Sequence, residues 1–152
     1  MRNTYLLAIC AVLILSGCSN QGNIKKLIEV HFEKLNRHDI EKIATDYSAD
    51  TKINSTGFDD VRTGPAQVKI IFNRYFSSSP DLHYTIKNII YTDTTATVEY
   101  ESAGSIPADD FTSPVYMRGK KYTLRNCTVY HIKDDRSHPN QAILIRTRFC
   151  TK

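Results

Sequence analysis

The chain has 152 residues, of which 41% are hydrophobic and 24% charged; this is an ordinary globular composition, sufficient for one hydrophobic core but not for two. Its formal net charge of +4 is too small to indicate nucleic-acid binding, which needs a concentrated basic stripe.

The first 17 residues have the features of an export signal. Arg2 supplies a positive start, and the apolar run from Tyr5 to Leu15 is too short to span a bilayer. The run leads into Leu15-Ser16-Gly17-Cys18, which resembles the lipobox of bacterial lipoproteins. We therefore expect a signal peptide over 1–17, a lipid on Cys18 with a short polar tether over 18–22, and a folded domain over 23–152. An uncleaved membrane anchor or a buried N-terminal helix is the alternative.

The resemblance to lipoproteins also implies a location. Lipoproteins of this kind carry more than one acyl chain, which durable attachment requires, so the membrane is the first predicted partner. Ser19, and not an aspartate, follows the lipidated cysteine. In a Gram-negative cell this implies the outer membrane, with the domain facing the periplasm.

Cysteine usage is consistent with export. Cys10 leaves with the signal and Cys18 carries the lipid, so the domain keeps Cys127 and Cys150. An even pair in an oxidising compartment predicts a disulfide, with two unpaired thiols as the alternative.

The mature chain begins with helical patterns and ends with strand patterns. Apolar residues recur with a helical period over 23–35, over 39–47 after Asp39 as N-cap, and over 65–76 after Gly64-Pro65. Between the last two helices we expect a short strand over 51–55 and a loop over 57–62. Beyond Pro80 the period becomes two, which predicts strands over 84–91, 95–102, 115–117, 121–133 and 142–149. Helices followed by a meander of strands predict an α+β fold with an antiparallel sheet.

The proposed disulfide sets a register for the last hairpin. With Cys127 opposite Cys150, Ile132 lies opposite Ile145 and His131 opposite Arg146. This register places the even-numbered residues from 128 to 132 on one largely apolar face, and a slip of one residue would reverse every face. On the preceding strand the same alternation predicts Tyr100 inside the fold, with Glu99 and Glu101 outside.

Three segments resemble SnoaL-like proteins of the nuclear transport factor 2-like superfamily, which includes polyketide cyclases and ketosteroid isomerases. They are His31–Asp39 followed by Asp46–Asp50, then Thr63–Leu82, and Lys120–Asp134. The resemblance implies a cone in which a strongly curved sheet wraps around three N-terminal helices, with a pocket at the open end. The family contains enzymes and non-enzymatic binding or dimerisation modules, so the fold does not decide the function.

The resemblance also shows which catalytic groups this chain lacks. The family's catalytic tyrosine position corresponds to His31, its carboxylate base to Ser55 and its late-strand acid to Thr128. A neutral hydroxyl cannot abstract a proton near pH 7, so an isomerase mechanism is not expected. The residues that we expect to line the pocket are Phe32, Tyr47, Ser55, Phe72, Tyr75, Tyr100, Thr128, Tyr130 and Phe149.

His31 is the candidate catalytic residue. It lies on the apolar stripe of the first helix, where it can act as an acid or base in the pocket. The alternative is a core histidine whose ring is satisfied by a hydroxyl such as that of Tyr47 or Tyr130. The sequence shows no acidic partner that would orient the ring, and we expect hydroxyls and rings at the cavity floor. No histidine or cysteine spacing indicates a metal site, and no cofactor is expected.

These observations leave three hypotheses. The first is an envelope lipoprotein whose pocket binds a small apolar ligand without catalysis. The second is a protein-interaction module that forms a homodimer or docks on an envelope component through its sheet face. The third is a cyclase- or isomerase-like enzyme with His31 as acid or base.

Overall fold

The computed structural model describes residues 19–53, 61–132 and 143–144. In chain order its elements are α2 (Ser19–Asn36), α3 (Ile40–Ala44), β1 (Lys52–Ile53), β2 (Arg62–Thr63), α4 (Pro65–Ser78), β3 (His83–Tyr91), β4 (Thr95–Ser105), the 3₁₀ turn η1 (Val115–Met117), β5 (Lys121–Ile132) and β6 (Ile143–Leu144). The chain is therefore α+β, as the sequence predicts. Signal residues 1–17, Cys18, Ser55, Phe149 and Cys150 lie outside the described residues.

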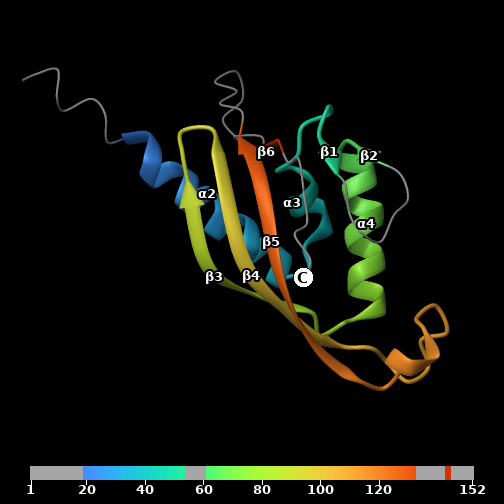
Figure 1. The fold of residues 1–152 in the computed structure, drawn as a ribbon. Coiled ribbons are helices and arrows are strands. Elements are labelled where there is room, and N and C mark those ends of the chain that lie inside the picture. The colour runs from blue at the N-terminus through green and yellow to red at the C-terminus, as the bar shows by residue number, and fades with distance from the viewer. Residues whose placement is uncertain (1–18, 54–60, 133–142, 145–152) are drawn as a thin grey trace, which may run out of the picture.

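The main sheet is antiparallel, with the strand order β3-β4-β5-β6, and β1 pairs with β2 in a separate two-stranded sheet. The long strands β3, β4 and β5 curve, and the three helices lie together on one side of them (Figure 1). Alternation along β4 explains this arrangement, because Ala96, Val98 and Tyr100 are buried against the helices. Glu99 is exposed and Glu101 half-buried on the outer face, as predicted.

The helices begin where local chemistry favours them, with one difference. Asp39 caps α3 by accepting a hydrogen bond from the backbone of Lys42, and Gly64 and Pro65 start α4, as predicted. α2, however, starts at Ser19 instead of Asn23, so the residues expected to form the tether are its first turn. Nothing in Ser19–Gly22 stops a helix, because a glycine near the end costs only about 1 kcal/mol.

The register of the last hairpin corrects the prediction drawn from the disulfide. Ile132 pairs with Ile143 and His131 with Leu144, whereas the sequence interpretation placed residues 145 and 146 there. The shift is two residues, which keeps each side chain on its face, so hydrophobic alternation does not distinguish the two registers. Thr128, Tyr130 and Ile132 are buried on the inner face, as predicted. The pairing of Cys127 with Cys150 stays a prediction, because Cys150 lies outside the described residues.

Two short segments also differ from expectation. Val115–Met117 forms a 3₁₀ turn and not a strand, since Pro114 precedes it and the backbone bonds run from Met117 to Pro114 and from Arg118 to Val115. Arg62–Thr63, expected to end a loop, pairs with Lys52–Ile53. Both results depend on contacts that local periodicity does not report.

Candidate functional site

The site is built around His31, which α2 carries on its buried face. Only 1% of His31 and 5% of Asp46 are exposed, and Nδ1 of the imidazole lies 2.8 Å from Oδ2 of the Asp46 carboxylate. Asp46 comes from the turn after α3, two residues beyond the helix end. A buried carboxylate therefore holds the ring in one orientation, which corrects the expectation that His31 has no acidic partner and that the cavity floor carries only hydroxyls and rings.

Lys34 contacts the second oxygen of the same carboxylate. It follows His31 by one turn on α2, so both side chains reach Asp46 from one face of the helix. Its ammonium donates to Oδ1 of Asp46, and a carboxylate paired in this way only accepts hydrogen bonds. Nδ1 of His31 therefore carries the hydrogen and donates it to Asp46, which leaves Nε2 as the acceptor.

Tyr47 completes a chain of three polar groups. Its hydroxyl lies 3.3 Å from Nε2 of His31 and is buried. Burial, together with the nearby charge of Asp46, raises the pKa of Tyr47 well above its ordinary value near 10. Tyr47 is therefore a neutral phenol that donates to His31, and the order of the chain is Tyr47 hydroxyl, His31 imidazole, Asp46 carboxylate.

Four tyrosines, called here the interior tyrosines, are buried in this region: Tyr47, which belongs to the chain, and Tyr84, Tyr100 and Tyr130. Burial raises the pKa of all four, so each stays a neutral hydroxyl. The Tyr100 hydroxyl lies 3.2 Å from Oγ1 of Thr128, and the ring of Tyr130 meets the His31 ring edge-on at 5.9 Å between centroids. The inside of the cone thus presents hydroxyls among aromatic rings.

The structure brings most of the residues predicted to line the pocket near one another. Phe32, Tyr47, Tyr100, Thr128 and Tyr130 are buried in the same region as His31. Phe72 and Tyr75 are half-buried on α4, where their rings meet at 6.1 Å. Sequence reasoning missed Asp46 and Lys34, because Asp46 stands next to Tyr47 at the end of a predicted helix stripe, where an acidic residue is usually solvated.

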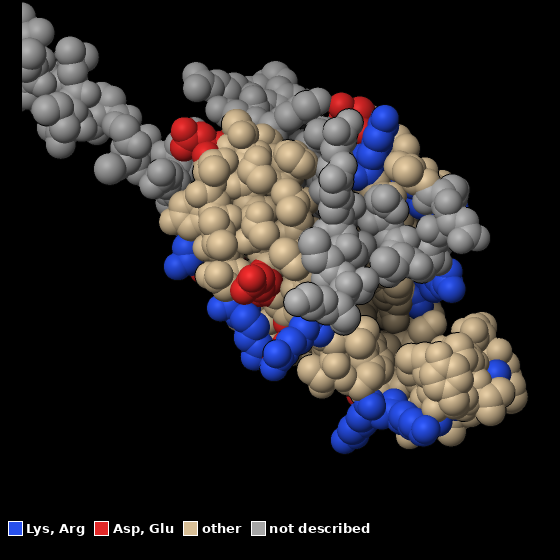
Figure 2. Space-filling model, viewed as in Figure 1, with Lys and Arg blue, Asp and Glu red and all other residues tan. Residues whose placement is uncertain are grey.

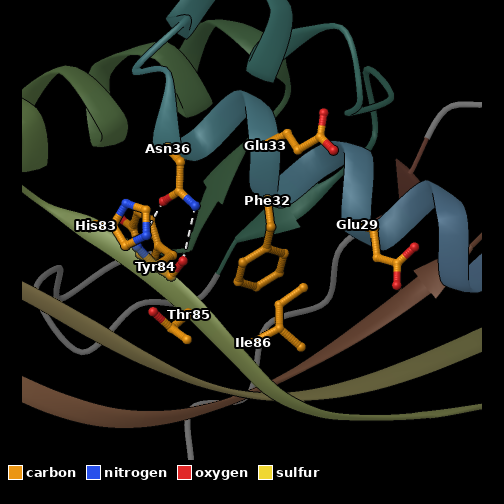
Figure 3. A pocket seen from close by; sticks show the side chains of 8 residues that line it. All are labelled: Glu29, Phe32, Glu33, Asn36, His83, Tyr84, Thr85 and Ile86. Atoms are coloured by element: carbon orange, nitrogen blue, oxygen red, sulfur yellow. Dashed lines mark hydrogen bonds between the residues drawn. The ribbon is translucent and has the colours of Figure 1, made fainter.

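An open groove lies between α2 and the edge strand β3 (Figure 3). Its volume is about 400 Å³. Phe32 and Ile86 form its apolar floor, and Glu29 and Glu33 belong to its helical wall. At its end the Asn36 amide donates to the Tyr84 carbonyl at 2.9 Å and accepts from the Tyr84 backbone N–H at 2.7 Å. Asn36 thereby occupies hydrogen-bonding positions of the exposed sheet edge.

In the described ranges, no group of three or more histidine, cysteine or acidic residues is arranged to hold a metal ion. Within the same ranges, no helix has the length and apolarity needed to cross a bilayer.

The chain is similar to known proteins of one family in sequence and to proteins of the same fold in structure. The model of the SnoaL-like domain matches residues 28–137. No curated protein matches the chain in sequence. Among solved structures, the chain is similar to SalBIII, an epoxide hydrolase/cyclase-like enzyme of pyran ring formation in the polyether salinomycin, with a TM-score of 0.67, 15% identity, and 86% of this chain and 93% of the other covered.

Two other structures show the same fold. One is a nuclear transport factor 2-like protein from Anabaena variabilis, with a TM-score of 0.64, 14% identity and coverage of 88% of this chain and 90% of that one. The other is a SnoaL-like polyketide cyclase from Agrobacterium tumefaciens, with a TM-score of 0.59, 14% identity and coverage of 72% and 81%. At these identities the likeness concerns the fold alone.

Proposed function

Because this chain belongs to the SnoaL-like domain family, we propose that it is an enzyme that moves protons on a small cyclic substrate, with His31 as the acid–base group. The hydrogen bond between buried Asp46 and His31, at 2.8 Å, carries the proposal. A histidine that a carboxylate orients is the usual form of a catalytic base, whereas the sequence alone predicted an unsupported ring.

The polar chain defines a path for the proton. Tyr47 accepts a proton from a substrate C–H group beside a carbonyl while it passes its own proton to Nε2 of His31. The electron pair of the broken C–H bond moves to the carbonyl oxygen, and the imidazolium that forms is stabilised by Asp46. Tyr47 stays neutral throughout, which agrees with its raised pKa.

The surroundings suggest the substrate class. The hydroxyls of the interior tyrosines and of Thr128 can hydrogen-bond carbonyl or hydroxyl oxygens, and the rings of these tyrosines pack against an apolar skeleton. A ring that carries ketone or hydroxyl groups satisfies both requirements. Of two proteins with the same fold, SalBIII is described as acting in pyran ring formation in a polyether, and the protein from Agrobacterium tumefaciens is described as a polyketide cyclase.

Binding of a small ligand without catalysis is the second candidate, and a specific observation favours it. The late-strand position that the family resemblance assigns to an acid is Thr128, whose hydroxyl interacts with the hydroxyls of Tyr100 and Tyr130. In addition, Lys34 already neutralises the charge of Asp46. In this candidate the polar chain stabilises the core, and the interior tyrosines bind the ligand.

We also propose, from the sequence, that the chain is exported and held in the cell envelope by a lipid on Cys18. A radiolabelled fatty acid tests this attachment. Cells that produce either the native chain or Cys18→Ser incorporate the label and are extracted with detergent, and the label on the two chains is compared. Label on the native chain alone would support a lipid on Cys18, and equal label on both chains would exclude it.

Exchange of carbon-bound hydrogen for deuterium tests the catalytic proposal. The chain is incubated in D₂O with 1-tetralone and cyclohexanone, and deuterium beside the carbonyl is followed by NMR. We expect exchange above the buffer rate, and we expect His31→Gln to reduce the catalysed rate by about 10²- to 10⁴-fold, the usual contribution of a general base.

The matched control is His131→Gln, because His131 is exposed on the outer face of the sheet. Its exchange rate should equal that of the native chain. Equal exchange by the native chain and His31→Gln would exclude His31 as the base. Chemical-shift changes of the interior tyrosines on adding the ketones, without exchange, would favour the binding protein.

A further inference from the structure

The loop between β4 and β5 carries the most exposed large apolar side chains of the described residues. This segment, Ile106–Lys120, is called the tip loop, and it extends beyond the helices at the far end of the long strands (Figure 1). Phe111 is 80% exposed, Val115 76% and Tyr116 72%. Large apolar residues gathered on a protruding loop indicate a surface that contacts an apolar partner.

The exposure is not the result of a loose loop, because polar groups hold its backbone. Asp110 accepts hydrogen bonds from the backbone and hydroxyl of Thr112 and from the hydroxyl of Ser113, which lower the pKa of Asp110 to about 2. Arg118 donates to the carbonyl oxygens of Ser113 at 3.0 Å and Phe111 at 3.1 Å. The loop is therefore built to keep its apolar side chains outward.

The charges on the tip loop indicate the chemistry of the partner. The guanidinium of Arg118 lies 5.2 Å from the centre of the Phe111 ring, and Lys120 and Lys121 are exposed at the base of the loop. Figure 2 shows Lys and Arg side chains beneath this end of the molecule. Asp110 stays ionised within its hydrogen bonds and Asp109 is exposed, so these two acids offset two of the three basic groups Arg118, Lys120 and Lys121, which leaves a net charge of +1.

We propose that the tip loop inserts into an anionic lipid surface, with Phe111, Val115 and Tyr116 in the interface and the basic groups on lipid phosphates. Aromatic rings beside lysine and arginine are the combination that membrane interfaces favour. A convex tip suits a deformable bilayer, and the basic side chains of Arg118, Lys120 and Lys121 can contact anionic headgroups. The proposal does not depend on any chemistry at His31.

The start of α2 and the tip loop lie at opposite ends of the molecule (Figure 1). Insertion of the tip loop beside a lipid on Cys18 would therefore hold the domain along the membrane at two points. Two attachments on one domain bind more tightly than either alone, because the second then binds within the same molecule.

The absence of tryptophan from the sequence allows a site-specific test in the full chain. Tyr116→Trp places a single fluorophore on the tip loop, and Ile70→Trp places one on α4 at a side chain that is 52% exposed. Both chains are reconstituted with vesicles of phosphatidylcholine and phosphatidylglycerol. Because the reporter is local, attachment through the N-terminal segment does not affect the comparison.

We expect the emission of Tyr116→Trp to shift to shorter wavelength and to be quenched by brominated acyl chains, while Ile70→Trp changes little. Adding Lys120→Gln and Lys121→Gln should weaken tip insertion about 30-fold, since each lysine near an anionic surface contributes about a fivefold factor. Equal responses of the two tryptophans would overturn the proposal. A shift of Tyr116→Trp that depends on protein concentration, without quenching by lipid, would assign the tip loop to self-association instead.

Discussion

Replacing Asp46 by asparagine tests the polar chain at the centre of the site. The two side chains have nearly the same shape, so the change removes charge and one acceptor without creating a cavity. The carboxylate now serves two donors, Nδ1 of His31 and Nζ of Lys34. Asparagine has a single carbonyl oxygen, which can accept from His31 or from Lys34, and its NH₂ group then faces the remaining donor.

The expected loss of stability follows from these contacts. A hydrogen bond to a charged group contributes about 1.5–3 kcal/mol, and breaking a buried ion pair costs about 3–5 kcal/mol. Lys34 is 23% exposed and can turn its ammonium toward water, which lowers the cost. We therefore expect Asp46→Asn to reduce the free energy of unfolding by about 2–4 kcal/mol, which corresponds to a Tm lower by roughly 8–15 °C.

Urea unfolding followed by far-UV circular dichroism measures this loss, with Asp109→Asn on the exposed tip loop as the control at about 0.5 kcal/mol or less. Adding Lys34→Met to Asp46→Asn should recover part of the stability, because the uncompensated ammonium is gone. The reasoning is refuted if Asp46→Asn unfolds at the same urea concentration as Asp109→Asn.

Asn36→Ala should lower the free energy of unfolding by about 1–3 kcal/mol, because it leaves the Tyr84 N–H and carbonyl without the Asn36 side chain as partner. Amide hydrogen exchange of Tyr84 should accelerate as well. Asn73→Ala, at an exposed position on α4, should change neither quantity. Gly104→Ala should destabilise by about 1–3 kcal/mol, since its Cβ would lie 2.3 Å from Oγ of buried Ser79, and a melting temperature equal to that of the native chain would contradict this packing. The interior tyrosines have pKa values raised above the ordinary value near 10, so their contribution to stability is complete below pH 10 and is lost as the pH rises above it. Above pH 10, each interior tyrosine should lower the free energy of unfolding by up to about 1.4 kcal/mol per pH unit. Their ionisation, read by absorbance at 295 nm, should coincide with loss of the circular dichroism signal, and ionisation of all of them in an intact fold would be the opposite result.

The sequence predicted the elements well where the signal is local. Asp39 and Gly64-Pro65 start their helices as expected, because capping and a fixed proline φ act within a few residues. Alternation of period two placed Tyr100 inside and Glu99 outside, since one face of the sheet must be buried. The same local reasoning identified His31 on the buried stripe of α2.

Three results became visible only in the structure. The partner of His31 comes from Asp46, 15 positions away, and only the packing of α3 against α2 brings the two together. The register of the last hairpin differs from its prediction by two residues, and such a shift leaves the pattern of buried faces unchanged. Val115–Met117 forms a turn where alternation favoured a strand.

The first two results share one physical reason, whereas the turn depends on local bonds that begin at Pro114. Periodicity and capping report which face of an element is buried, because these are properties of the chain over a few residues. They do not report which polar groups meet inside the core, because that choice is made by the relative positions of distant elements. The sequence therefore determined the α+β order and the buried face that carries His31, and the packing of the turn after α3 against α2 decided that this histidine has a carboxylate partner.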